Sequence, residues 1–165
     1  MKKLLYVIAV ALCMVACESN TPNGGSITKG DYEDLGLTSG TKWKVVNELN
    51  PQDQGNGFYT YDGGIDAFGK NIPTKEQWTE LVNECTWIWT GMGYKVLGPN
   101  GKSITLPASG YRGVDGNVYY VNTVGYYWSS MSDGAENAWG LYFNSGKVHL
   151  GNNNRRFGLS VRLVK

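Results

Sequence analysis

Hydrophobic residues recur with helical spacing in one part of the chain. The positions i, i+3, i+4 and i+7 are occupied by Trp78, Leu81, Val82 and Cys85. This spacing predicts a helix with a single apolar face. Thr74 lies just before it and a glutamine follows three residues later, so we expect the helix to begin with a capping box. Cys85 is therefore expected to be a buried core thiol rather than a nucleophile.

Short segments elsewhere predict β-strands, because β-branched and aromatic residues alternate with polar ones between turn signals. These segments are residues 41–46, 94–97, 103–106, 118–121, 126–129, 138–143, 147–150 and 159–163. Residues 98–101, Gly-Pro-Asn-Gly, are a strong turn signal between two of them. Residues 47–68 favour a loop rather than a helix, so only one helix is predicted with certainty from pattern.

The pattern over residues 138–150 predicts a hairpin with a defined register. A two-residue turn at Ser145 and Gly146 places Tyr142 opposite His149 and Phe143 opposite Val148. Because side chains alternate between the faces of a strand, each residue is assigned to one face. The predicted core face holds Trp139, Leu141, Phe143, Val148 and Leu150. The predicted solvent face holds Gly140, Tyr142, Lys147 and His149.

The first residues resemble a bacterial lipoprotein signal. Residues 4–16 are almost wholly apolar, which is shorter than the ~20 residues of a membrane-spanning helix. Residues 14–17, Met-Val-Ala-Cys, resemble a lipobox, with Met14 where leucine is usual. The resemblance implies removal of residues 1–16, lipid on Cys17 and a flexible tether over residues 17–30. It places the protein at the cell envelope, anchored in the outer membrane; ordinary secretion with cleavage near Ala16 is the alternative.

Composition narrows the functions of the remaining domain, residues 31–165. Loss of Lys2 and Lys3 with the signal lowers the formal net charge from +1 to −1, which leaves no basic field for nucleic acid. Cys85 is the one cysteine of the domain, so no internal disulfide is expected. The chain has a single histidine, and we therefore expect no metal site and no cofactor. Six Trp and eleven Tyr supply a core and adaptable contact surfaces.

Five segments together resemble the Fibrobacter succinogenes major paralogous domain, a family common in lipoproteins of the Bacteroidetes. They are residues 32–43, 72–78, 106–112, 125–130 and 158–164. That family is similar to the C-type lectin-like fold of formylglycine-generating enzymes. The resemblance implies an α+β domain with one or two helices packed on a small, twisted, mainly antiparallel sheet with long loops. Its amino and carboxyl ends would lie close together.

The C-terminal segment also resembles the variable region of proteins diversified by retroelements, which vary surface side chains on C-type lectin-like scaffolds. The positions that this resemblance implies for ligand binding are Tyr142, His149, Gly151, Asn152, Asn153, Asn154 and Arg156. Met131, Asp133 and Trp139 are expected to border them. In such regions template adenines are the mutated bases. Trp139 and Lys147 fit this pattern less well, because their codons do not arise readily from an asparagine codon. An ordinary, undiversified member of the family would also carry asparagines here.

These features predict a non-catalytic binder of a protein or glycan ligand. The formylglycine-generating enzymes depend on reactive cysteines, and the pattern places Cys85 on a core face. No nucleophile elbow and no calcium-lectin Glu-Pro-Asn loop is present in the sequence. Three alternatives stay open: a solvated loop of no function, a structural subunit of an envelope assembly, and an enzyme with an unrecognised site. Arg155 and Arg162 are expected to be structural, pairing with acids or capping carbonyls.

Overall fold

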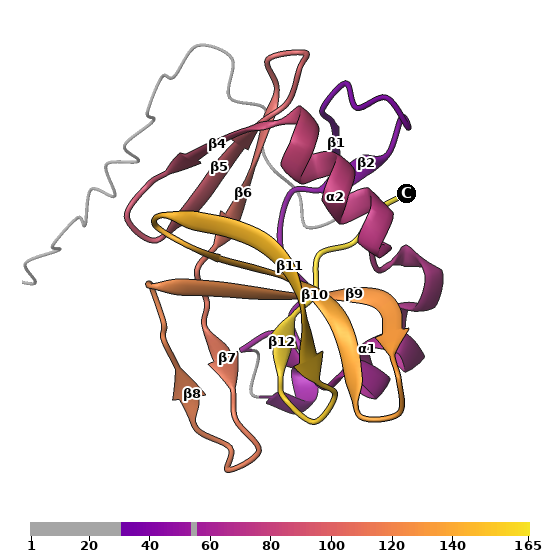
Figure 1. Cartoon of the computed structure of the whole chain (residues 1–165), viewed down its shortest axis with the longest axis vertical. Helices are drawn as coiled ribbons and strands as arrows, with labels where there is room; N and C mark the ends of the chain where they lie inside the picture. The colour runs from indigo at the N-terminus through magenta and orange to yellow at the C-terminus, as the bar shows by residue number, and fades with distance from the viewer. Residues whose placement is uncertain (1–30, 54–55) are drawn as a thin grey trace, which may run out of the picture.

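The computed structural model describes residues 31–53 and 56–165, so the predicted signal peptide, Cys17 and the tether lie outside the described residues. The chain is α+β, as predicted, with two short α-helices and several antiparallel sheets (Figure 1). In chain order the elements are β1 (Tyr32–Asp34), β2 (Lys42–Lys44), η1 (Pro51–Asp53), β3 (Phe58–Tyr59), α1 (Tyr61–Phe68), η2 (Gly69–Asn71), α2 (Lys75–Glu84), β4 (Thr86–Trp89), β5 (Gly93–Leu97), β6 (Ser103–Pro107), β7 (Tyr111–Arg112), β8 (Val118–Tyr119), β9 (Val124–Asp133), β10 (Asn137–Asn144), β11 (Lys147–Asn154) and β12 (Leu159–Ser160).

The largest sheet has the strand order β11-β10-β9-β12-β3. All its pairs are antiparallel except β12 with β9. Figure 1 shows α2 and the β4-β5-β6 sheet on one side of its long strands, with α1 and the β7-β8 hairpin on the other. Each face of these strands therefore meets a different set of elements.

The β10-β11 hairpin has the predicted register. Tyr142 lies opposite His149 and Phe143 opposite Val148, around the turn at residues 145–146. Leu141 and Phe143 are fully buried, which confirms the core face. The pairing continues further than predicted, to Asn137 opposite Asn154. The asparagine run thus belongs to a strand, because its backbone groups are paired along β10.

Two hydrophobic clusters form on the two faces of the large sheet. On the α2 side the buried side chains include Trp43, Trp78, Tyr127, Leu141 and Phe143. On the α1 side they include Tyr59, Tyr61, Trp128, Leu159 and Val161. Tyr127 and Trp128 are neighbours in sequence and enter opposite clusters, as strand alternation requires.

Helix α2 begins as predicted. The Thr74 hydroxyl accepts from the backbone N–H of Gln77 (3.2 Å), and the Gln77 side chain accepts from the N–H of Thr74 (2.9 Å). Trp78 and Leu81 are fully buried on its inner face. Cys85 follows the last helical residue and packs half-buried against the core, where burial raises the pKa of its thiol to about 11.

Helix α1 lies where a loop was predicted, so that prediction is wrong for residues 61–68. Thr60 caps the helix by accepting from the N–H of Gly63 (3.2 Å). A glycine pair in the first turns disfavours a helix by roughly 1 kcal/mol per residue. Tertiary packing overrides this cost. The helix backbone at Gly64 lies so close to the core that an added Cβ would be 3.5 Å from the Ile72 side chain and 3.6 Å from that of Val161.

The C-terminal strand is shorter than predicted, since β12 ends at Ser160. Residues 158–164 are all buried, so this segment still lies in the core. Arg162 is fully buried there and has the structural role that was expected. Its guanidinium donates to the carbonyls of Lys44 (2.6 Å) and Thr105 (2.7 Å) and to the Asn47 side chain (2.9 Å). One side chain thus connects three separate segments, and its burial lowers its pKa.

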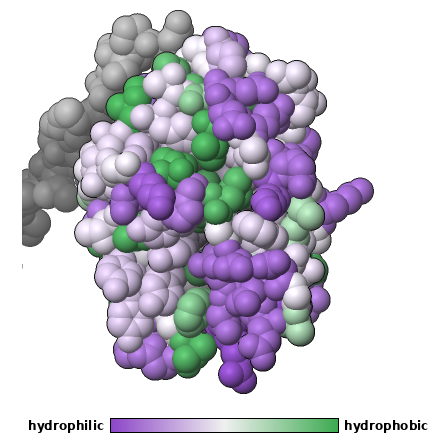
Figure 2. Space-filling model, viewed as in Figure 1, coloured by the Kyte–Doolittle hydropathy of each residue, from purple (hydrophilic) through white to green (hydrophobic). Residues whose placement is uncertain are grey.

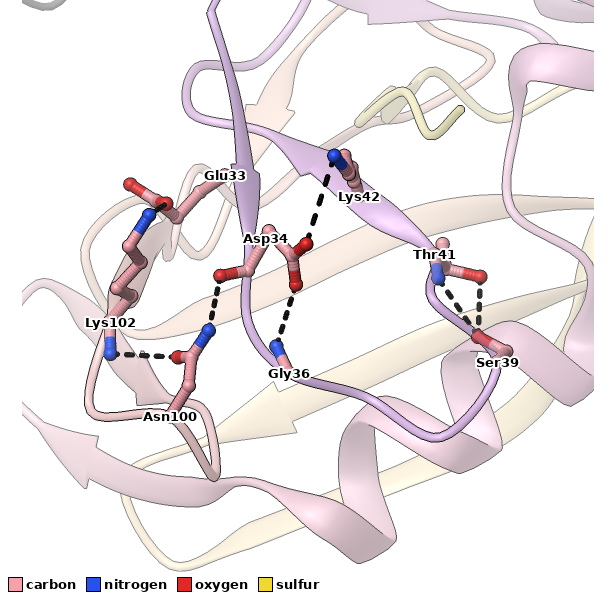
Figure 3. A network of polar contacts seen from close by, with 8 residues as sticks. All are labelled: Glu33, Asp34, Gly36, Ser39, Thr41, Lys42, Asn100 and Lys102. Atoms are coloured by element: carbon pink, nitrogen blue, oxygen red, sulfur yellow. Dashed lines mark hydrogen bonds and ion pairs between the residues drawn. The ribbon is translucent and has the colours of Figure 1, made fainter.

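The start and the end of the described domain lie side by side. Lys42 and Lys165 exchange two backbone hydrogen bonds of 3.0 and 3.1 Å. A polar network also ties β1 to the turn between β5 and β6 (Figure 3). In it the Asn100 amide donates to the carbonyl of Asp34 (2.7 Å), and Lys102 donates to Glu33 (2.8 Å).

Candidate ligand-binding surface

Three aromatic side chains cross strands β9, β10 and β11 on the face turned away from α2. Tyr142 lies between Tyr126 and His149, its cross-strand neighbours. Its ring centroid is 5.1 Å from that of Tyr126 and 4.7 Å from that of His149, with tilted ring planes. The Tyr142 hydroxyl accepts a hydrogen bond of 3.0 Å from the Asn144 amide. The predicted outward pair Tyr142 and His149 is therefore part of a longer aromatic row.

An open hollow of about 420 Å³ lies over this row. This "histidine hollow" is lined by Tyr126, Tyr142, Lys147, His149, Gly151, Asn152 and Asn153. Burial, and secondarily the charge of Lys147, lower the pKa of His149, so its imidazole is neutral at pH 7. Its Nδ1 atom is buried and has no hydrogen-bond partner among the described residues.

Strand alternation divides the predicted site residues between two faces. Gly151 and Asn153 share the face of Tyr142 and His149, because they lie at even spacing along β11. Asn152 borders the histidine hollow at the sheet edge, but its amide donates to Asp133 (2.6 Å).

Trp139 lies opposite Asn152 on the α2 side. The ammonium of Lys75, from α2, lies 3.2 Å from the centroid of the Trp139 ring. Trp139 and Asp133 thus do not line the hollow with Tyr142, although Asn152, which does, bonds to Asp133.

The remaining predicted residues lie apart from the histidine hollow. Met131 is exposed on β9 and does not line the histidine hollow. Asn154 and Arg156 line another depression, beside Asp62 and Glu136. The Asn154 side chain accepts from the backbone N–H of Arg156 (3.0 Å), which fixes the turn after β11. Arg155 pairs with Asp62 and donates to the Ala135 carbonyl (3.3 Å), the structural role that was expected.

A second hollow, which the sequence did not indicate, adjoins the first. This "tyrosine cleft" has a volume of about 250 Å³ and is lined by Tyr111, Tyr120, Tyr126, Asn153, Phe157 and Leu159. The Tyr111 ring centroid lies 5.3 Å from that of Tyr126 and 5.2 Å from that of Phe157. The cleft and the histidine hollow share Tyr126 and Asn153, so the two form one continuous surface.

The backbone of Tyr120 is strained. Its φ is 58°, a left-handed conformation that costs a bulky residue ~1–3 kcal/mol. The Tyr120 carbonyl accepts from the N–H groups of Thr123 and Val124 (both 3.1 Å) and from the Thr123 hydroxyl (2.8 Å). These bonds hold the side chain at the mouth of the cleft, where it is 61 % exposed.

The surface offers ring faces, hydroxyls, an amide and a neutral imidazole. Among residues 31–53 and 56–165, no group of three or more His, Cys, Asp or Glu is placed to hold a metal ion. No helix in the described part of the chain is long and apolar enough to span a membrane. On the face shown in Figure 2, hydrophobic residues form small groups among hydrophilic ones.

Comparison with known proteins gave one match. A protein-family model, described as a domain of unknown function, matches residues 70–164 and so covers every residue of both hollows. No curated protein and no solved structure matches the chain. The matched region extends from just before α2 to the end of the core. Because it spans more than half of the sequence, the chain belongs to this family, the domain of unknown function DUF8237.

Proposed function

We propose that this protein binds a protein or glycan ligand at the cell envelope without catalysing a reaction. The observation that carries the proposal is the continuous aromatic surface formed by the histidine hollow and the tyrosine cleft. Tyrosine supplies rigid amphipathic area, and asparagine supplies adaptable hydrogen bonds. Strands of the large sheet hold Tyr126, Tyr142 and His149, so the surface is preorganised.

The C-type lectin-like fold is part of this proposal. Two helices flank a mainly antiparallel sheet, and the ends of the described domain are hydrogen-bonded to each other. Both features support the resemblance to the Fibrobacter succinogenes major paralogous domain. The proposed anchor is lipid on Cys17, which would hold the domain at the outer membrane.

Diversification of the surface is a further part of the proposal. Tyr142, His149, Gly151 and Asn153 lie on one face, where they can vary without disturbing Leu141 and Phe143 behind them. We expect a reverse transcriptase gene beside this gene. We also expect a near-copy of the region that encodes β10 and β11, differing from it mainly at adenines. Absence of both would remove diversification and leave the binding proposal in place.

A structural subunit is the second candidate, and the β7-β8 hairpin favours it. This segment exposes several large apolar side chains: Val114 (69 %), Val118 (38 %), Tyr119 (38 %), Tyr120 (61 %) and Val121 (52 %). Exposed apolar residues so close together are typical of a protein interface. A stable partner recovered in mild detergent, and lost on Val114→Ser, would favour this candidate.

The binding proposal is tested with Tyr142→Ala and His149→Ala in the full chain. Both variants are expected to stay folded, with at most a small decrease of the unfolding midpoint, and to lose capture of ligand from an array of glycans and envelope proteins. Ile88→Ala is the matched control, because Ile88 is 46 % exposed on β4, away from the site. Ligand capture that survives both substitutions would refute the proposal.

A further inference from the structure

We propose that the tyrosine cleft is a sugar-binding subsite that holds one ring of a neutral oligosaccharide without calcium. This inference rests on the proposed function and specifies its ligand class. The cleft adjoins the histidine hollow, where the next sugar ring would lie. Tyr126 and Asn153 belong to both hollows and would contact both rings.

The walls of the cleft suit the face of a pyranose ring. Tyr111, Tyr120, Tyr126 and Phe157 surround it with aromatic rings. The centroids of Tyr111 and Tyr120 are 6.1 Å apart with an interplanar angle of 31°. An aromatic face carries negative charge density, which attracts the weakly positive C–H groups on one face of a sugar. The same sugar ring presents hydroxyl groups around its edge.

The tyrosine hydroxyl groups of the cleft are free to form hydrogen bonds with the hydroxyl groups of a sugar. The four buried tyrosines, Tyr59, Tyr61, Tyr94 and Tyr127, each donate to a backbone carbonyl at 2.7 to 3.0 Å. By contrast, the side-chain hydroxyls of Tyr111, Tyr120 and Tyr126 make no hydrogen bond to any residue within the described ranges. The protein thus uses its core hydroxyls internally and leaves those of the cleft open.

Asn153 supplies an amide at the boundary between the two hollows. Its side chain extends over Gly140, where an added Cβ would come within 3.2 Å of the amide nitrogen. This amide also makes no hydrogen bond within the described part of the chain. An amide has two donors and one acceptor, which suits adjacent sugar hydroxyls.

The backbone of Tyr120 is held in place before a ligand arrives. Its left-handed backbone is maintained by the three bonds to its carbonyl and by close packing against Gly110. An added Cβ at Gly110 would come within 1.9 Å of the Tyr119 carbonyl oxygen. Strain at an exposed aromatic residue is typical of a functional site, since stability alone would favour glycine there.

The charge around the cleft argues against a quaternary ammonium ligand. Aromatic cages bind such cations through ring faces. No Asp or Glu lines the tyrosine cleft among the described residues, and the adjoining hollow contributes the ammonium of Lys147. A cation would therefore meet repulsion without a counter-charge, whereas a neutral sugar would not.

The test uses the full chain in detergent, EDTA in the buffer, and immobilised maltohexaose, cellohexaose, chitohexaose and mannohexaose as probes. Tyr120→Gly removes the ring and keeps a residue that adopts left-handed backbone freely. It is expected to lower the affinity for a bound hexasaccharide roughly tenfold or more. Its unfolding midpoint should equal or exceed that of the wild type.

Two further variants separate the ring from its hydroxyl. Tyr120→Phe keeps the stacking face and is expected to lower affinity only about threefold, the loss of one hydrogen bond. Val121→Ala is the matched control, because Val121 is 52 % exposed on the same loop but does not line the cleft. Its affinity should equal that of the wild type.

Three results would overturn the inference: wild-type sugar affinity in Tyr120→Gly, binding of tetramethylammonium or a proline-rich peptide in the cleft, and no binding of any hexasaccharide. The proposed function would survive these results if a protein ligand were captured and then lost in Tyr142→Ala. Loss of all ligand capture by the wild type would refute both.

Discussion

Tyr126 and Tyr127 are adjacent in sequence and lie in opposite environments. Tyr127 is fully buried on the α2 side, where its hydroxyl donates to the Pro107 carbonyl (2.7 Å) and accepts from Asn47 (3.1 Å). Burial raises its pKa to about 12. Tyr126 is half-buried between two open hollows, and its hydroxyl makes no hydrogen bond within the described ranges.

This contrast shows how one strand can serve two purposes. Because successive side chains of β9 alternate between faces, the same backbone supports a closed core on one side and an open aromatic surface on the other. Residues on the closed side contribute chiefly to stability. Those on the open side are available to a ligand, and substitutions there should affect binding more than folding.

The largest expected effect separates the two tyrosines by stability. Tyr127→Ala removes a fully buried ring and should lower the free energy of unfolding by about 3–5 kcal/mol. Tyr126→Ala should lower it by only about 1 kcal/mol, because that ring is only partly buried. Urea unfolding followed by tryptophan fluorescence measures both. Equal losses would contradict the assignment of the two faces.

A smaller effect isolates the hydroxyl groups. Tyr127→Phe removes the hydroxyl that donates to the Pro107 carbonyl and accepts from Asn47, and should cost about 1–2 kcal/mol of stability. Tyr126→Phe should leave the free energy of unfolding unchanged, since its hydroxyl has no partner to lose among the described residues. The same urea titrations apply. A cost at Tyr126 as large as that at Tyr127 would show that its hydroxyl is bonded.

The smallest effect concerns His149 and pH. Burial lowers the pKa of His149 below the ordinary value of 6.5, so the unfolded chain binds the proton more readily. The contribution of the neutral His149 imidazole to stability is therefore fully present above pH 6.5. It is lost as the pH decreases through 6.5 toward the lower folded-state pKa. The unfolding midpoint should decrease between pH 7.5 and 5.5.

His149→Gln provides the control for this decrease. The chain has a single histidine, so the variant should show a flatter profile over the same interval. An identical slope in both proteins would assign the pH dependence to carboxyl groups instead.

Local patterns predicted the elements whose signals lie close together in sequence. The capping box of α2, the turn at residues 98–101 and the register of the β10-β11 hairpin are all present. Each depends on residues a few positions apart, and the register follows from the pleat once the turn is placed. The outward position of Tyr142 and His149 follows from the same rule.

Other elements depend on contacts between distant segments. The glycine pair of α1 disfavours a helix in the sequence pattern, but the helix forms because it packs against Ile72 and Val161. Trp139 was expected to border the ligand site, but it lies on the opposite face of β10 from Tyr142, where Lys75 of α2 covers its ring. The extension of β11 to Asn154 depends on backbone pairing with Asn137, and polar side chains carry no signal for it.

Alternation along β10 and β11 assigns each side chain to a face, so the residues that can build a binding surface were predictable from the sequence. Where that surface ends depends on tertiary packing. Tyr111 and Tyr120 come from the β7-β8 hairpin and the residue after it, and Phe157 comes from the turn after β11. The Tyr111 ring contacts those of Tyr120, Tyr126 and Phe157, so it joins these segments beside β9. The physical reason is that hydrophobic burial has no direction: it favours contact between aromatic rings but does not specify which ones meet.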